Sequence, residues 1–69
     1  MQRTKLKLLR VEKGWSQEDV AKQIGISTQS YALIERGIRF GSHGTWEKIK
    51  NLYQIADSDM WELQSTKQN

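Results

Sequence analysis

The sequence predicts an all-α fold, a compact domain of five short helices, and three observations lead to this prediction. Apolar residues recur three and four positions apart along the chain, which is the spacing of one helix face. Serine stands before several of these stretches and glycine after them, as at the two ends of helices. The 69 residues allow one small domain, so we expect a single domain over residues 1–69 with its core at about 4–64. The polar residues 65–69 carry no pattern and are expected to fray.

The stretch from residue 16 to residue 37 is the most informative, and its first half predicts a helix. Ser16 is a candidate N-cap, and Asp19 three residues later gives a weaker form of the Ser-x-x-Glu capping box. Val20 and Ile24 fall on one face of this helix. Gly25 ends it, because glycine takes the left-handed C-terminal conformation without a steric cost.

The second half of this stretch predicts another helix after a tight turn. Ser27 offers its N-cap, and Tyr31 and Ile34 continue the inward stripe. The outward face contains no acidic residue and consists of Thr28, Gln29, Ala32, Leu33 and Arg36. Thr and Gln can hydrogen-bond to base edges, Leu or Ala can touch a thymine methyl group, and Arg can reach a phosphate. A short polar helix held across a packed helix is the layout of a helix-turn-helix, which we predict over residues 17–36.

The flanking segments predict two longer helices. Residues 4–13 form the first helix of the chain, and Trp15 follows it as an apolar anchor of the core. Residues 43–54 form the fourth helix, capped by Ser42 or Thr45.

A short fifth helix is expected up to about Gln64, capped by Asp57 or Ser58. Met60 and Leu63 are three apart and can both face inward. Trp61 is then offset by roughly 100° and is expected to be partly exposed.

Charge is distributed unevenly along the chain. The net charge of +3 at pH 7 is compatible with nucleic-acid binding without requiring it. Four basic residues with no acid between them gather in the first ten positions: Arg3, Lys5, Lys7 and Arg10. This basic end is either a nucleic-acid face or a solvated charged helix, and both interpretations stay open.

Taken together, these residues resemble the lambda-repressor-like helix-turn-helix family, of the Cro/CI or XRE type. The resemblance extends from about residue 5 to residue 63, and its spacing is most specific between Gln17 and Gly37. The matching residues are Leu6, Leu9, Arg10, Gly14 to Gln17, Val20, Ala21, Gly25 to Ser27, Ile34 to Gly37, Ser42, Trp46, Ile49, Ile55 and Leu63. The resemblance implies the compact five-helix DNA-binding domain of that family.

The resemblance also implies roles for single residues. The family's arginine at the position of Arg10 pairs with a glutamate at the end of the recognition helix, here Glu35; a phosphate contact is the alternative for Arg10. Gln17 matches a family glutamine that contacts a phosphate at a helix N-terminus, and its alternative is a helix-capping residue with an exposed amide. Family members commonly have proline where this chain has Gly41, so the loop is expected to be less rigid here.

These observations predict a sequence-specific transcriptional regulator that binds double-stranded DNA. The resemblance implies that it represses by occupying an operator. The candidate base-reading residues are Ser27, Thr28, Gln29 and Leu33. The candidate phosphate-binding residues are Arg10, Gln17, Arg36 and Arg39. One monomer makes few contacts, so we expect a homodimer on an inverted repeat, with half-sites about 34 Å apart.

Three residues form a candidate dimer surface: Leu52, Met60 and Trp61. For Leu52 the alternative is packing at the edge of the core. A second class of function also stays open, a protein-interaction module such as an antitoxin or adaptor on the same scaffold. Apolar side chains such as Leu33 would suit that module. The absence of acidic residues from the outward face of the helix after Ser27 favours DNA binding instead.

Other function classes find no support in the sequence. There is no cysteine, and the single His43 has neither clustered ligands for a metal nor the Ser or Cys nucleophile arrangement of a catalytic site. No catalytic motif is present, and we expect no enzymatic activity, cofactor or small-molecule ligand. No apolar run approaches the ~20 residues that span a membrane. The resemblance implies a cytoplasmic, nucleoid-associated protein of bacterial or phage origin.

Overall fold

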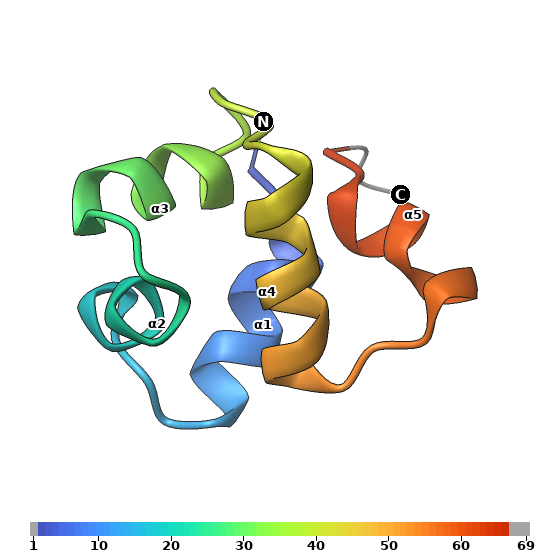
Figure 1. Cartoon of the computed structure of the whole chain (residues 1–69), viewed down its shortest axis with the longest axis horizontal. Coiled ribbons are helices and arrows are strands. Elements are labelled where there is room, and N and C mark those ends of the chain that lie inside the picture. The colour runs from blue at the N-terminus through green and yellow to red at the C-terminus, as the bar shows by residue number, and fades with distance from the viewer. Residues whose placement is uncertain (1, 67–69) are drawn as a thin grey trace.

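The computed structural model describes residues 2–66, which form five α-helices, one 3₁₀-helix and no strand. The elements are α1 (Thr4–Glu12), α2 (Gln17–Ile24), α3 (Thr28–Glu35), α4 (His43–Tyr53), η1 (Asp57–Asp59) and α5 (Met60–Gln64). In Figure 1, α4 runs through the middle of the view, with α2 and α3 on one side and α5 on the other. The predicted all-α fold of five helices is therefore confirmed.

The three central helices begin at serine N-caps, and in each case the cap is local in sequence. Ser16 accepts a hydrogen bond from the Asp19 backbone N–H, and the Asp19 carboxylate accepts one from the Ser16 backbone N–H, which completes the predicted capping box. Ser27 and Ser42 cap α3 and α4 by accepting a hydrogen bond from the backbone N–H three residues later, without the reciprocal bond, so Ser42 rather than Thr45 is the cap of α4. Gly25 ends α2 in the left-handed conformation, with φ of 74°.

The capping box makes the stability of α2 depend on pH. The hydrogen bond from the Ser16 backbone N–H holds the pKa of Asp19 below its ordinary value, and the Ser16 side chain adds to this shift. A carboxylate with a lowered folded pKa stabilises the fold above its unfolded pKa of about 3.9, and this contribution disappears as the pH falls through the folded pKa. We expect Asp19→Asn to lose less stability than the wild type between about pH 4 and pH 2. Urea unfolding followed across this range measures the difference, and parallel profiles for the two proteins would contradict the assignment.

The core lies between all five helices. Ten apolar side chains are buried in it: Leu6, Val20, Ala21, Ile24, Tyr31, Ile34, Trp46, Ile49, Tyr53 and Leu63. Trp15 is half-buried beside them, with its ring centroid 5.9 Å from that of Tyr53, and so anchors the turn between α1 and α2. Each helix contributes an apolar face with helical spacing, as the sequence predicts.

The beginning of the fifth helix differs from the prediction. Neither Asp57 nor Ser58 caps a helix, because the chain enters a 3₁₀ turn there without any side-chain cap hydrogen bond. Asp57 instead pairs with Lys50 near the end of α4. Leu63 is buried, as expected. Of the residues predicted to fray, 67–69 lie outside the described residues, and Ser65 donates its backbone N–H to the Glu62 carbonyl.

The basic N-terminal cluster does not form a free charged face, because most of its charges have partners within the protein. The side chain of Arg3 is buried in the fold, and Lys5 pairs with Glu62 of α5. Arg10 is paired with Glu35 of α3. Three of the four charges therefore hold α1 to other parts of the molecule. No helix among residues 2–66 is long and apolar enough to cross a membrane.

Candidate nucleic-acid interface

Helices α2 and α3 pack closely because the residues where they meet are small or turn sharply. Ala21 is 1 % exposed, which leaves no room for a larger side chain between the helices. The turn between them is closed by the backbone N–H of Ile26, which donates to the Ala21 carbonyl at 3.0 Å. The buried side chains of Tyr31 and Ile34 fix the inward face of α3, so its rotation about its own axis is determined. The opposite face of α3 is thereby turned outward.

This outward face carries polar and small apolar side chains at positions suited to the edges of bases. Thr28 and Gln29 are exposed in its first turn, and Leu33 lies half-exposed one turn later. The helix contains one acidic residue, Glu35, and it is buried with its side chain turned inward. No carboxylate of α3 therefore opposes the approach of a polyanion.

Ser27 lies at the N-terminal edge of this face, but its hydroxyl group already has partners. It accepts a hydrogen bond from the Ser30 backbone N–H at 3.1 Å and donates to the Ser30 Oγ at 2.9 Å. The structure thus uses Ser27 as the N-cap of α3. With its proton donated to Ser30 and one lone pair used by the cap, the Ser27 hydroxyl group retains one lone pair to accept a hydrogen bond from a base.

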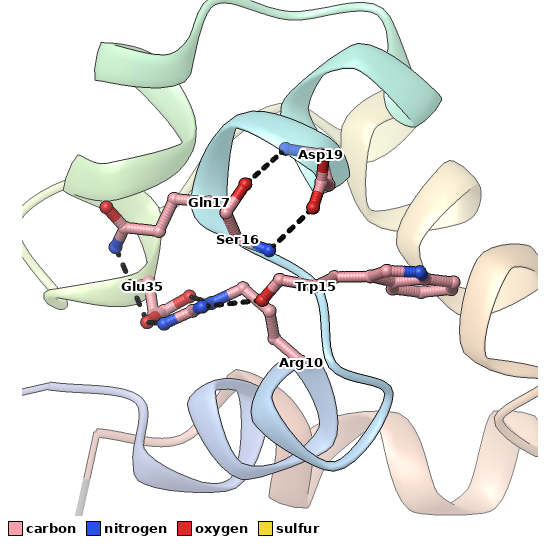
Figure 2. Close-up of polar contacts among 6 residues, drawn as sticks. All are labelled: Arg10, Trp15, Ser16, Gln17, Asp19 and Glu35. Atoms are coloured by element: carbon pink, nitrogen blue, oxygen red, sulfur yellow. Dashed lines mark hydrogen bonds and ion pairs between the residues drawn. The ribbon is translucent and has the colours of Figure 1, made fainter.

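Arg10 and Glu35 form a paired, nearly buried contact between α1 and the end of α3 (Figure 2). Arg10 Nε and Nη2 each donate to one carboxylate oxygen of Glu35 at 2.9 Å, which is the bidentate arrangement. The remaining amino group, Nη1, donates to the Trp15 carbonyl at 2.9 Å. The hydrogen bond to Glu35 raises the pKa of Arg10. All three donor nitrogens of Arg10 form hydrogen bonds within the protein. These contacts favour a structural role for Arg10 over a phosphate contact.

Gln17 lies in the first turn of α2 and points toward the same carboxylate (Figure 2). Its Nε2 donates to Glu35 Oε1 at 3.4 Å, a long hydrogen bond that leaves the second amide proton available. The side chain is half-buried. The carboxylate of Glu35 therefore orients Gln17 as well as Arg10.

Two tyrosine hydroxyl groups close to this pair were not singled out by the sequence. The hydroxyl groups of Tyr31 and Tyr53 are buried beside the Glu35 carboxylate, where they interact with each other. Burial raises the pKa of both phenols, most strongly for Tyr31, and the nearby Glu35 carboxylate adds to the shift. Both tyrosines are therefore neutral at physiological pH. Their apolar spacing predicts burial but contains no signal for where a hydroxyl group ends up.

The loop after α3 adds two exposed basic side chains to the outward face. Arg36 is the C-cap residue of α3 and Arg39 follows three residues later. Arg39 Nη1 lies 3.5 Å from the Ser30 Oγ, so its guanidinium group extends back along α3. The structure thus brings Arg36 and Arg39 to the end of the same helix that exposes Gln29.

The candidate dimer residues differ in exposure. Leu52 and Met60 are half-buried against the core, whereas Trp61 is 70 % exposed. A groove of about 300 Å³ lies between α1 and α5 and is lined by Lys5, Leu9, Ile55, Asp59, Glu62 and Leu63. Within residues 2–66 no cluster of three His, Asp or Glu side chains is placed to hold a metal ion.

Comparison with known proteins identifies the family from these same segments. A family model described as helix-turn-helix, of the XRE and lambda-repressor-like type, matches residues 6–39, from the middle of α1 to Arg39. No curated protein shows a significant match to the chain. Proteins of the matched family are DNA-binding regulators and are generally not enzymes. The chain belongs to the XRE or lambda-repressor-like helix-turn-helix family of DNA-binding transcription regulators.

Proposed function

We propose that this regulator is a sequence-specific repressor that occupies an operator in double-stranded DNA as a homodimer, with α3 in the major groove. The observation that carries the proposal is the outward face of α3. It exposes Thr28 and Gln29, contains no outward carboxylate, and leads directly to Arg36 and Arg39. Such a face offers base-edge hydrogen bonds at one end and positive charge at the other.

Sequence reading is assigned to the first two turns of α3. The Gln29 amide can donate to N7 and accept from N6 of adenine in a bidentate contact, and Thr28 can hydrogen-bond to a neighbouring base. The half-exposed Leu33 can contact a thymine methyl group. Ser27 remains a candidate beside the groove wall, with its hydroxyl group also serving as the cap.

Phosphate binding is assigned to side chains that flank α3. Arg36 and Arg39 are exposed at its C-terminal end, and Gln17 presents an amide proton from the start of α2. Arg10 stays paired with Glu35 and holds in place the carboxylate to which Gln17 donates. Phosphate contacts fix the register of the protein on the duplex, whereas the base contacts of α3 discriminate between sequences.

Dimer formation is assigned to the end of the chain that includes α5. Trp61 is the most exposed of the large apolar side chains among the described residues, and a large exposed aromatic group is a frequent centre of association. Leu52 and Met60 would contribute the edge of this surface. Two subunits on half-sites about 34 Å apart double the number of contacts to DNA.

Selection of random duplexes on the purified protein tests the proposal, with binding of the selected sequence repeated at two salt concentrations. Enrichment of an inverted repeat, with affinity that falls steeply in salt, is the expected result. Enrichment of a single short site would support sequence-specific binding and contradict the proposed homodimer. Absence of any enriched, salt-sensitive site would contradict sequence-specific binding.

The Gln29 amide gives the first specific prediction. We expect Gln29→Ala to relax the base preference at one operator position, with a loss of about 1–3 kcal/mol in discrimination and little change in stability, because the side chain is exposed. Gln23→Ala is the matched control, since Gln23 is exposed on α2 and away from the reading face. Competition binding against the four single-base variants at each position measures the effect. Unchanged discrimination at every position would remove Gln29 from the base-reading residues.

The guanidinium group of Arg39 gives a prediction of another kind. We expect Arg39→Ala to weaken binding to all sequences alike and to reduce the slope of log K against log salt by about one, because one phosphate contact is lost. Lys22→Ala is the control, since Lys22 is an exposed cation on α2 outside the proposed face. Titrations at four salt concentrations give the slopes. A slope equal to that of the wild type would show that Arg39 makes no phosphate contact.

One observation favours the second candidate function, a protein-interaction module. Trp61 and Leu8 are 70 % and 61 % exposed, and exposed apolar side chains of this size are contacts that a protein partner could bury. The two functions differ in their response to salt, since protein contacts through apolar side chains weaken little when salt is added. Salt-insensitive association without duplex binding would favour the interaction module.

A further inference from the structure

Arg3 is a buried cation that stands before the first helix and contacts the end of the recognition helix. It is 4 % exposed, and its Nε donates to the Gln64 carbonyl at 2.8 Å. Its Nη1 donates to the carbonyls of Ile34 at 2.5 Å and Arg39 at 2.9 Å. Its backbone N–H donates to the Glu35 carbonyl at 2.7 Å. Four carbonyl groups from distant parts of the chain thus meet on one arginine.

Two aromatic rings complete the surroundings of this guanidinium group. Its central carbon lies 5.4 Å from the ring centroids of both Phe40 and Trp46, within the range of cation–π attraction. The two rings are 5.6 Å apart, and the Trp46 indole N–H donates to the Phe40 carbonyl at 2.5 Å. Phe40 is therefore fixed to the start of α4 as well as to Arg3.

These contacts converge on the segment from Ile34 to Phe40, which we call the basic loop because it carries Arg36 and Arg39. From the other side, the backbone N–H groups of Ile38 and Arg39 donate to the Leu33 carbonyl at 3.0 and 3.2 Å. The backbone of the basic loop is thus held between α3 and Arg3. Figure 1 shows the N-terminus beside the connection from α3 to α4, in agreement with these contacts.

We propose that Arg3 is a positioning residue of the DNA interface, which holds the basic loop in the conformation that presents Arg39 to the phosphate backbone. The inference rests on the proposed function, because it concerns how that interface is formed. A loop that is ordered before binding loses less conformational entropy when it meets its ligand. Arginine suits the task, since its planar fork can donate in several directions while its faces lie against rings.

The position of Arg3 distinguishes this role from a direct DNA contact. A side chain that is 4 % exposed and engaged by three carbonyl groups cannot reach a phosphate in this conformation. Its effect on binding must therefore pass through the basic loop. The expected signature is energetic coupling to Arg39, with base discrimination by Gln29 left intact.

Amide hydrogen exchange on the free protein tests whether Arg3 orders the basic loop. We expect Arg3→Lys to accelerate exchange at Ile38 and Arg39 at least tenfold, because a point charge cannot replace the fork, while the amide of Ile26 in the α2–α3 turn is unchanged. Lys7→Met is the matched control, since it removes an exposed side-chain charge from α1 and keeps the backbone hydrogen bond from Lys7 to the Arg3 carbonyl. Equal acceleration at all three amides would indicate a general loss of stability and would overturn the proposal.

A second variant keeps the test decisive if Arg3→Lys does not fold. Phe40 is 55 % exposed, so Phe40→Leu removes one ring of the cation–π pair with little disturbance of the core. We expect a smaller acceleration, about two- to fivefold, at the amides of Ile38 and Arg39. Wild-type exchange at both amides in this variant would count against the role of Arg3.

DNA binding then tests whether the order of the loop matters for the interface. We expect Arg3→Lys to weaken duplex binding about tenfold, the loss of one charge-assisted contact, with unchanged base preference. In the Arg39→Ala background the same change should weaken binding less than twofold. Equal losses in the two backgrounds would overturn the proposal. If the wild type binds no duplex, the proposed function fails, whereas the exchange at Ile38 and Arg39 still decides whether Arg3 holds the loop.

Discussion

Glu35→Ala is expected to destabilise the protein by about 3–5 kcal/mol, the usual loss when one partner of a buried ion pair is removed. The side chain of Arg10 is 13 % exposed and that of Glu35 3 %, so the guanidinium group would be left with a charge that water barely reaches. A domain of 69 residues has a free energy of unfolding of only about 3–10 kcal/mol, at roughly 0.05–0.15 kcal/mol per residue. We therefore expect a large part of Glu35→Ala to be unfolded at 37 °C, as measured by circular dichroism.

Two further variants separate the buried charge from other effects of the substitution. Glu18→Ala removes a carboxylate that is 66 % exposed and 3.9 Å from Lys22, and its expected effect is below about 1 kcal/mol. Replacing both partners, as Arg10→Met with Glu35→Met, leaves no unpaired charge and should recover much of the lost stability. A double variant as unstable as Glu35→Ala would show that the pair contributes through its shape rather than through its charge.

Gly41→Pro is expected to destabilise the protein by about 2–3 kcal/mol, although proline is the common family residue at this position. Gly41 has φ of 91°, whereas a prolyl ring fixes φ near −65°. A Cβ atom at this position would also lie 3.0 Å from Ile34 Cδ1 and 3.6 Å from the Trp46 indole nitrogen. The loop that carries Arg39 therefore takes a path here that a proline cannot follow.

Gly44→Ala serves as the control for this loop substitution. Gly44 lies in the first turn of α4, and an added Cβ would meet only the Ser42 Oγ, at 3.9 Å. Here alanine lowers the entropy of the unfolded chain without strain, so we expect a gain of up to about 0.5–1 kcal/mol. Urea unfolding of both variants gives the comparison. Equal stability of Gly41→Pro and the wild type would mean that the loop readily takes another conformation.

The parts of the fold that could be predicted from the sequence are those determined within a few residues. Ser16 with Asp19 specifies the start of α2, and Gly25 specifies its end, because cap, carboxylate and left-handed turn all lie within one or two helical turns. The inward side chains of α3 follow from spacing alone. The outward face, with Gln29 at its centre, is then the complement of the buried one.

The parts that could not be predicted depend on contacts between distant residues. A basic residue near the N-terminus is indistinguishable in sequence from one that faces a phosphate, so nothing marks Arg3 as buried among carbonyl groups and rings. Asp57 is a good N-cap by residue type, yet Lys50 lies near enough to pair with it. At Gly41, the replacement of the family's common proline predicted a less rigid loop. The positive φ at this position shows in addition that the backbone conformation of the loop requires glycine.

The hydrogen bond from Arg3 to the Gln64 carbonyl joins residues 61 positions apart, and this has a consequence for the order of events during synthesis. The contacts between α2 and α3 are local in sequence, so they can form earlier than contacts that span the whole chain. Arg3 emerges first of all these residues, but its last partner emerges after α4 and most of α5. A nascent chain therefore acquires its recognition helix before the loop beside it is fully secured. The hydrogen bond to the Gln64 carbonyl is the last contact of Arg3 to form, and it requires that residue 64 has been released from the ribosome.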